Sequence, residues 1–146
     1  MTDRQAISPN AAQIEFWNSA ASLAWADHYQ RMDRAVADLT KALLDMAAPQ
    51  PGEHELDIGC GSGTTLLELA ARVGPSGRVL GADVSNQSVA RARQRIADAG
   101  SRHAEVIVAD VSVHPFEPNS LSWRSRASGS CSSAIRGPPS QMCAVR

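Results

Sequence analysis

The chain has 146 residues, 43% of them hydrophobic and 20% charged, and a formal net charge of −1 at pH 7. This length and composition predict one domain with a hydrophobic core. No run of residues approaches the length of a membrane span, and the N-terminus MTDRQAISPN holds no apolar signal segment, so we expect a cytoplasmic protein.

Cysteine and histidine are both sparse and scattered. The three cysteines, Cys60, Cys131 and Cys143, predict neither a disulfide framework nor a zinc site. We interpret Cys60 as a small apolar residue of a turn, because no histidine or asparagine pattern accompanies it as for a nucleophile. The four histidines show no ligand spacing. We therefore expect reduced thiols and no bound metal.

Residues 1–50 are predicted to form an N-terminal helical cap. Asn10 can cap a helix whose apolar residues are Ile14, Trp17 and Ala21. A longer helix over about residues 29–48 carries an apolar stripe on one face, formed by Met32, Val36, Leu39, Leu43 and Met46. Pro49 and Pro51 then end this helix.

The most informative stretch is residues 55–65, ELDIGCGSGTT. A short buried strand comes first, and glycines at alternate positions then remove side chains where the chain must turn sharply and approach a ligand; these are Gly59, Gly61 and Gly63. A helix with apolar residues at helical spacing begins at Thr64. The N–H groups at its start point at the loop and favour a carboxylate or phosphate.

The spacing of these glycines separates two cofactor classes. A dinucleotide loop needs G-x-G-x-x-G, and its third glycine would fall at Thr64 or at Leu66 in the two possible registers, so both registers fail. What stands here is D-x-G-x-G-x-G, beginning at Asp57. In this form the loop resembles the first motif of class I S-adenosylmethionine-dependent methyltransferases. That resemblance implies that the loop holds the amino-acid end of the cofactor.

Two further predicted strands each end in an acidic residue. Residues 78–84 (RVLGADV) carry Asp83, whose carboxylate can accept hydrogen bonds from both ribose hydroxyls. Residues 104–109 (AEVIVA) precede Asp110, where the resemblance places contacts to the adenine ring. The candidate cofactor-binding residues are therefore Asp57, Gly59, Cys60, Gly61, Ser62, Gly63, Asp83, Val84, Asp110 and Val111.

Simpler interpretations stay open for two features. Asp110 can cap the turn that follows its strand. Arg91, Arg93 and Arg95 form a basic run, but only Arg91 and Arg95 share a face of the helix predicted over residues 88–99, and a solvated helix surface explains them. We therefore expect no nucleic-acid partner.

From residue 1 to about residue 118 the chain is similar to the front half of a methyltransferase from the group that includes the ubiquinone and menaquinone biosynthesis enzymes. The resemblance implies a Rossmann-like α/β fold in which residues 51–120 bind S-adenosylmethionine. In similar enzymes N-terminal helices close over cofactor and substrate. Trp17 or Tyr29 lining the site is therefore an alternative to packing of Trp17, Trp25 and Tyr29 against the sheet.

The composition changes abruptly after residue 121. Residues 1–121 hold ten Lys plus Arg against fifteen Asp plus Glu, whereas residues 122–146 add four Arg and no acidic residue. A biased tail is one explanation. The other is a frameshift, because an allowed codon choice for residues 121–144, read two nucleotides later, spells FVAISRFGVMFFGDPRAAFANVR, which resembles the fourth strand and next helix of these enzymes. We predict an aberrant, disordered tail at residues 121–146.

A truncated sheet would have physical consequences. The resemblance implies the strand order 3-2-1-4-5-7-6, of which the chain would supply strands 1–3 alone and leave strand 1 at an edge. A central strand exposed in this way presents unpaired backbone groups, a recognised route to aggregation. We therefore expect weak solubility, or a molten or oligomeric state, with self-association through strand 1.

The leading functional hypothesis is a truncated S-adenosylmethionine-dependent methyltransferase with a small-molecule acceptor. The alternatives are a non-enzymatic remnant or partner-binding fragment and, disfavoured by both failed registers, a nicotinamide-dependent oxidoreductase. Methyl transfer depends on holding acceptor and methyl group in line, without a covalent enzyme intermediate. The family's acceptor pocket lies largely in the cap and after strand 4, so we assign no catalytic residue, no acceptor and no methylated atom.

Overall fold

The computed structural model describes residues 9–116 and 123–127. Three helices come first, namely α1 (Ala11–Trp17), α2 (Ala20–Asp27) and α3 (Tyr29–Ala47). Strands and helices then alternate as β1 (His54–Ile58), α4 (Thr64–Val73), β2 (Arg78–Asp83), α5 (Asn86–Asp98) and β3 (Ala104–Val108), and β4 (Trp123–Ala127) follows the gap. Within these two ranges, no helix has the length and apolar character needed to cross a membrane.

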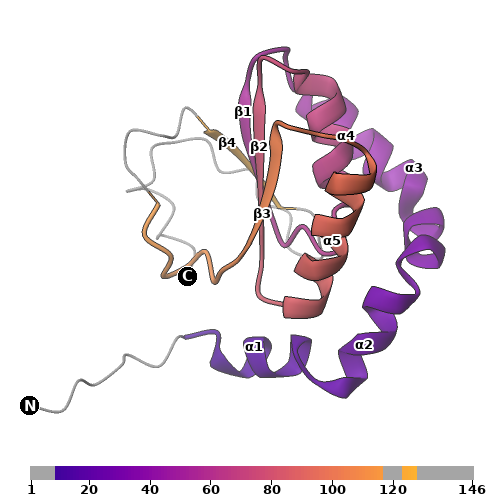
Figure 1. Cartoon of the computed structure of the whole chain (residues 1–146), viewed down its shortest axis with the longest axis vertical. Coiled ribbons are helices and arrows are strands. Elements are labelled where there is room, and N and C mark those ends of the chain that lie inside the picture. The colour runs from indigo at the N-terminus through magenta and orange to yellow at the C-terminus, as the bar shows by residue number, and fades with distance from the viewer. Residues whose placement is uncertain (1–8, 117–122, 128–146) are drawn as a thin grey trace, which may run out of the picture.

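All four strands run parallel, in the order β3-β2-β1-β4. Leu56 of β1 lies opposite Leu80 of β2, and Gly81 of β2 lies opposite Val106 of β3. Helices α4 and α5 are the crossovers between successive strands and lie against the same face of the sheet (Figure 1). This arrangement confirms the Rossmann-like α/β half that we predicted, with strands 1–3 and their helices in the expected order.

The predicted position of strand 1 at the edge is wrong. β1 pairs with β4 along its whole length, from His54 opposite Trp123 to Ile58 opposite Ala127. Parallel pairing uses backbone groups alone, so a segment of unusual composition can still satisfy the N–H and C=O groups of a neighbouring strand. The expected self-association through an open β1 edge therefore loses its basis. Apart from β4, the predicted tail and the consequences of a frameshift lie outside the described residues.

The core lies between the sheet and the two crossover helices. Apolar residues at helical spacing point from α4 and α5 onto the strands, and the fully buried ones are Leu66, Leu69, Val73, Val89 and Ala92. Val79 and Val106 face them from the sheet. Because burying one leucine or valine side chain stabilises a fold by about 1.5–3 kcal/mol, this cluster is the main source of stability in the sheet half.

The cap differs from its prediction in two places. The first helix ends at Trp17, because the side-chain amide of Asn18 donates to both the Ile14 and the Val84 carbonyl oxygens, and α2 begins separately at Ala20. Asn10 occupies the N-cap position but makes no capping hydrogen bond with its side chain. The cap thus bends around the sheet half, with α2 against α5 and α3 against α4 (Figure 1).

The apolar stripe of α3 lies mostly at the surface. Leu39 is 60% exposed and Met46 is 84% exposed, while Leu44 is the residue of α3 that joins the core. The helix ends as predicted before Pro49, with Ala48 in the left-handed conformation at a φ of 45°.

Candidate functional site

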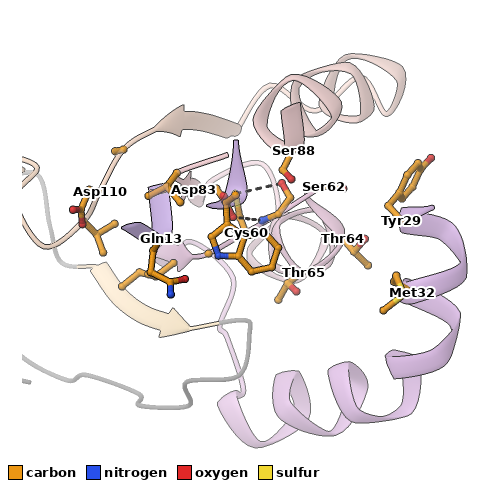
Figure 2. A pocket seen from close by; sticks show the side chains of 18 of the residues that line it. Gln13, Tyr29, Met32, Cys60, Ser62, Thr64, Thr65, Asp83, Ser88 and Asp110 are labelled. Carbon is orange, nitrogen blue, oxygen red and sulfur yellow. Dashed lines mark hydrogen bonds between the residues drawn. The ribbon is translucent and has the colours of Figure 1, made fainter. Parts of the chain in front are cut away.

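A cavity of about 880 Å³ lies at the C-terminal ends of β1, β2 and β3 (Figure 2). The loop between β1 and α4 lines it from the sheet side, together with the residues that follow β2 and β3. The cap lines it from the other side, through Asn10, Gln13, Trp17, Tyr29, Met32, Asp33, Val36 and Thr40. In open parallel sheets, ligands bind outside the carboxyl ends of the strands, so this is the expected place for a ligand site.

Most of the predicted cofactor-binding residues line this cavity, namely Gly59, Cys60, Gly61, Ser62, Asp83, Val84, Asp110 and Val111. Asp57 and Gly63 do not. Asp57 is completely buried in β1 opposite Gly81, behind the loop. Gly63 is the N-cap of α4 at a φ of 86°, and a Cβ atom there would lie 3.0 Å from the Ala92 Cβ, so its missing side chain serves helix packing.

The glycine loop leaves its backbone accessible to a ligand. Gly61 has a φ of 53°, and a Cβ atom at this position would meet nothing within 4 Å, so the loop opens into the cavity there. Hydrogen bonds hold the turn from both sides: the Gly59 N–H donates to the Ala82 carbonyl at 2.8 Å, and the Gly63 N–H donates to the Cys60 carbonyl at 2.9 Å. Hydrogen bonds within the protein therefore hold the glycine loop in this conformation.

Asp83 joins the loop to the tip of β2. Its Oδ2 accepts the Gly61 N–H at 2.9 Å and its Oδ1 accepts the Ser85 N–H at 2.8 Å. A carboxylate offers about four lone-pair sites, so each oxygen can accept one more hydrogen bond. The backbone contacts fix the carboxylate at the cavity wall and leave it able to accept two hydroxyl groups.

Asp110 caps a turn and also contacts the cap. Its Oδ1 accepts hydrogen bonds from the Ser112 N–H at 3.0 Å and the Ser112 hydroxyl at 2.7 Å, as the simpler interpretation predicted. The Asn10 side chain donates to the same oxygen at 3.0 Å. A contact between positions 10 and 110 was not foreseen, because the sequence shows Asn10 only as a potential helix cap.

Cys60 lies in the core with 5% of its surface exposed. A Cβ atom on Gly81 would lie 2.8 Å from its sulfur, which shows how closely the thiol packs on β2. Burial, followed by the nearby charges of Asp57 and Asp83, raises the pKa of the Cys60 thiol far above its usual value. The thiol stays protonated, in agreement with a packing role. Among residues 9–116 and 123–127, no cluster of three or more His, Cys, Asp or Glu could hold a metal ion.

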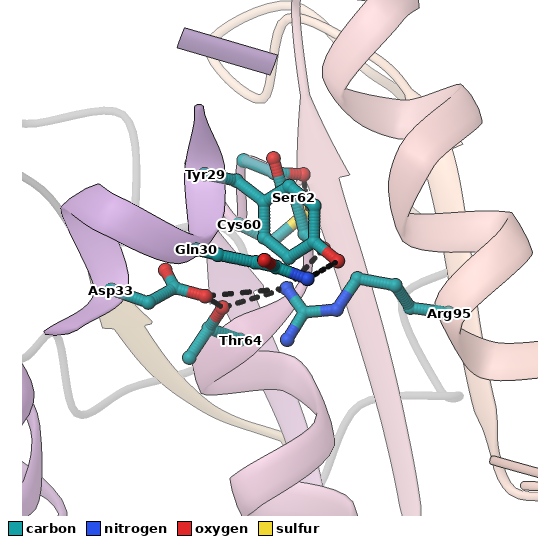
Figure 3. Close-up of polar contacts among 8 residues, drawn as sticks. Tyr29, Gln30, Asp33, Cys60, Ser62, Thr64 and Arg95 are labelled. Atoms are coloured by element: carbon teal, nitrogen blue, oxygen red, sulfur yellow. Dashed lines mark hydrogen bonds and ion pairs between the residues drawn. The ribbon is translucent and has the colours of Figure 1, made fainter. Parts of the chain in front are cut away.

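Sequence reasoning missed the role of Arg95 (Figure 3). The expectation of a solvated side chain is wrong, because the Arg95 side chain is 21% exposed and its Nη1 donates to the Ser62 carbonyl and the Thr64 hydroxyl. It also lies 4.6 Å from the ring centre of Tyr29. The available signal in the sequence was that Arg91 and Arg95 share one face of their helix. In the structure, both guanidinium groups lie over the ring of Tyr29.

The fold and the glycine loop define a Rossmann-like domain of the class I, S-adenosylmethionine-dependent methyltransferase type. Residues 56–123 match the model of the family described as "Methyltransferase domain".

Two curated relatives and one solved structure illustrate the relationship. The nocamycin O-methyltransferase of Saccharothrix syringae is 38% identical over 72 residues, which are 49% of this chain and 26% of the relative. The demethylmenaquinone methyltransferase of Anoxybacillus flavithermus is 28% identical over 102 residues, which are 66% of this chain and 43% of the relative. A coclaurine N-methyltransferase bound to N-methylheliamine and SAH is 25% identical at a TM-score of 0.52, covering 57% of this chain and 25% of that chain. The chain thus spans less than half the length of the curated relatives it matches.

Proposed function

We propose that the cavity at the ends of β1–β3 binds S-adenosylmethionine, and that the chain is the cofactor-binding part of a methyltransferase for small molecules. The observation that carries this proposal is the Asp83 carboxylate, held by the Gly61 and Ser85 N–H groups at the cavity wall. The Asp83 carboxylate lies between the glycine loop on one side of the cavity and the lining residues Val84, Asp110 and Val111 on the other.

The residues present fit the parts of this cofactor. Asp83 has acceptor capacity for two ribose hydroxyls. Val84 and Val111 offer apolar contact for an adenine ring, and Asp110 can accept from its amino group. The start of α4 suits the carboxylate of the amino-acid end, because helix N-termini favour anions.

When bound, S-adenosylmethionine would supply a methyl group activated on a sulfonium. The work left to the protein is to orient the two reactants, which can account for effective molarities of about 10⁵ M or more. The aromatic and apolar side chains of the cap, Trp17, Tyr29, Met32 and Val36, form the cavity wall that could receive an acceptor and exclude water.

A small organic acceptor suits this wall better than a nucleic acid does. Arg91 and Arg95, the basic pair on α5, both lie over Tyr29 and are engaged with the cap. The named relatives act on nocamycin-type and menaquinone-type compounds. A cytoplasmic location is also part of the proposal, because Cys60 is a free thiol and reduced thiols suit that compartment.

Titration calorimetry with S-adenosylmethionine, S-adenosylhomocysteine and NAD tests the proposal on the full chain. We expect the two methyltransferase ligands to bind and NAD not to bind. The Asp83→Ala variant should lose about 1 kcal/mol or more of binding free energy, because at least one ribose hydroxyl loses its acceptor. Binding of NAD alone, or of none of the three, would contradict the proposal, and unchanged affinity in Asp83→Ala would remove that residue from the site.

A further inference from the structure

The guanidinium of Arg95 connects the glycine loop to the start of α4. Its Nη1 donates to the Ser62 carbonyl at 2.9 Å and to the Thr64 hydroxyl at 2.7 Å. These two acceptors lie on either side of Gly63, where the loop becomes helix (Figure 3). Because Arg95 belongs to α5, the orientation of the loop is fixed by a side chain from another element.

The same guanidinium also reaches the cap. It lies 3.5 Å from Oδ2 of Asp33 and 4.6 Å from the ring centre of Tyr29, both of which belong to α3. The Thr64 hydroxyl donates to the same Asp33 oxygen. We call these residues the Arg95 clasp, which consists of Tyr29, Asp33, Ser62, Thr64 and Arg95.

The clasp is neither a surface ion pair nor part of the apolar core. The side chains of Arg95 and Asp33 are 21% and 30% exposed, so solvent screens them less than an open pair. Tyr29, Asp33, Ser62 and Thr64 all line the cavity. The clasp therefore stands at the end of the cavity that the amino-acid part of the proposed cofactor would occupy.

We propose that Arg95 is a positioning residue that makes the glycine loop and α3 one mechanical unit, so that recognition of the cofactor's amino-acid end depends on the docked cap. This inference rests on the proposed function. Arg95 acts on the cofactor site through Ser62 and Thr64, because the contacts of its side chain are with these two residues and with the cap. Loss of Arg95 should loosen the loop and α3 together.

Arg91 provides a matched control on the same face of α5. It too lies over Tyr29, at 5.6 Å, and it forms an ion pair with Asp27 at 3.8 Å. Its described contacts are with the cap and do not include the loop. Arg91→Met therefore removes the same charge and a similar aromatic contact, and it leaves the hydrogen bonds to Ser62 and Thr64 in place.

Binding of two probes separates positioning from general loss of stability. S-adenosylhomocysteine carries the amino-acid end, and 5′-methylthioadenosine lacks it. Because a hydrogen bond to a charged group is worth about 1.5–3 kcal/mol, Arg95→Met should weaken S-adenosylhomocysteine by roughly tenfold or more and 5′-methylthioadenosine by less than about threefold. Arg91→Met should change the two affinities by similar, small factors. An equal change for both probes in Arg95→Met would overturn the proposal.

Hydrogen exchange without ligand decides the same point independently of cofactor binding. Arg95→Met should raise amide exchange both at residues 61–65 and at the start of α3, whereas Arg91→Met should affect the cap alone. If Arg95→Met loosens the cap and leaves the loop unchanged, the inference fails even where the wild-type chain binds cofactor. If the wild-type chain binds neither probe but exchange rises in both segments, the proposed function fails and the mechanical link between loop and cap stands.

Discussion

The sheet half and the N-terminal cap are held in place by different forces. Between the sheet, α4 and α5 lies a cluster of fully buried apolar side chains, to which the cap contributes Leu44. Apart from Leu44, the cap is tied to the sheet half by polar contacts, among them those of Asn10, Asn18 and the Arg95 clasp. Since a hydrogen bond contributes about 0.5–1.5 kcal/mol net, the cap should undock at a much smaller free energy than the sheet half unfolds.

This contrast matters because the cavity lies between the two regions. The sheet half supplies the glycine loop and Asp83, while the cap supplies the aromatic and apolar wall. If the sheet half is rigid and the cap is weakly held, a ligand can enter between them without disturbing the glycine loop. Substitutions in one region at a time test whether the cap and the sheet half are held independently.

The largest effect is expected in the core. Leu69 is fully buried, and Leu69→Ala should lower the free energy of unfolding by about 2–5 kcal/mol, because it removes packing and leaves a cavity. Leu39 lies on the exposed stripe of α3, and Leu39→Ala should change the free energy of unfolding by about 0.5 kcal/mol or less. Urea unfolding of both variants measures the difference, and equal losses would show that the cap is as tightly packed as the core.

Two glycines of the loop should respond differently to the same added methyl group. In Gly63→Ala, both the left-handed backbone and the Ala92 contact at 3.0 Å oppose the new Cβ, so we expect about 1–3 kcal/mol of lost stability. In Gly61→Ala the Cβ enters open space on the cavity side of the loop. Compared with Gly63→Ala, this variant should therefore lose less stability and more affinity for S-adenosylhomocysteine. Thermal unfolding and calorimetry on the same samples test this reversal, which a uniform loss of both properties would refute.

A smaller effect is expected at the joint between α1 and α2. Asn18 donates to the Val84 carbonyl at 2.8 Å and accepts from the Asn86 N–H and side-chain amide at 2.9 Å. Asn18→Ala should therefore cost about 1–2 kcal/mol of cap docking and leave the sheet half folded. Limited proteolysis should cut α1 and α2 faster while residues 54–108 stay resistant. Simultaneous cleavage of both regions would contradict the separation.

The smallest effect is expected at Cys60. Its raised pKa keeps the thiol protonated and slow to react, and this protection comes from the sheet half. In a Cys131→Ser, Cys143→Ser background, Asn18→Ala should leave the reaction of Cys60 with a disulfide reagent unchanged. A faster reaction would mean that cap opening also opens the core.

The sequence predicted the sheet half well because local and long-range signals agree there. The glycines, the helix from Thr64 and the acidic strand ends each have a local cause, and parallel strands bring their ends together wherever crossovers are short. Eight of the ten candidate residues consequently line one cavity, with Asp57 and Gly63 as the two that do not.

The cap and the edge of β1 were harder to predict. The side chain of Asn18, at the end of α1, donates a hydrogen bond to the Val84 carbonyl. The side chain of Arg95 donates to Ser62 and Thr64. Each role therefore depends on a partner far away in sequence. The pairing of β4 with β1 uses backbone groups, which composition does not reveal. Residue patterns report burial and turns, whereas these contacts arise only when the elements meet.

The footprint of S-adenosylhomocysteine on the full chain, measured by hydrogen exchange at each amide, tests whether this cavity is the cofactor site. We predict protection at residues 59–64, 83–85 and 110–112, with a smaller increase at the start of α3. These segments surround the cavity at the ends of β1, β2 and β3. Protection confined to other segments, or no change at saturating ligand, would contradict the assignment of this cavity as the cofactor site.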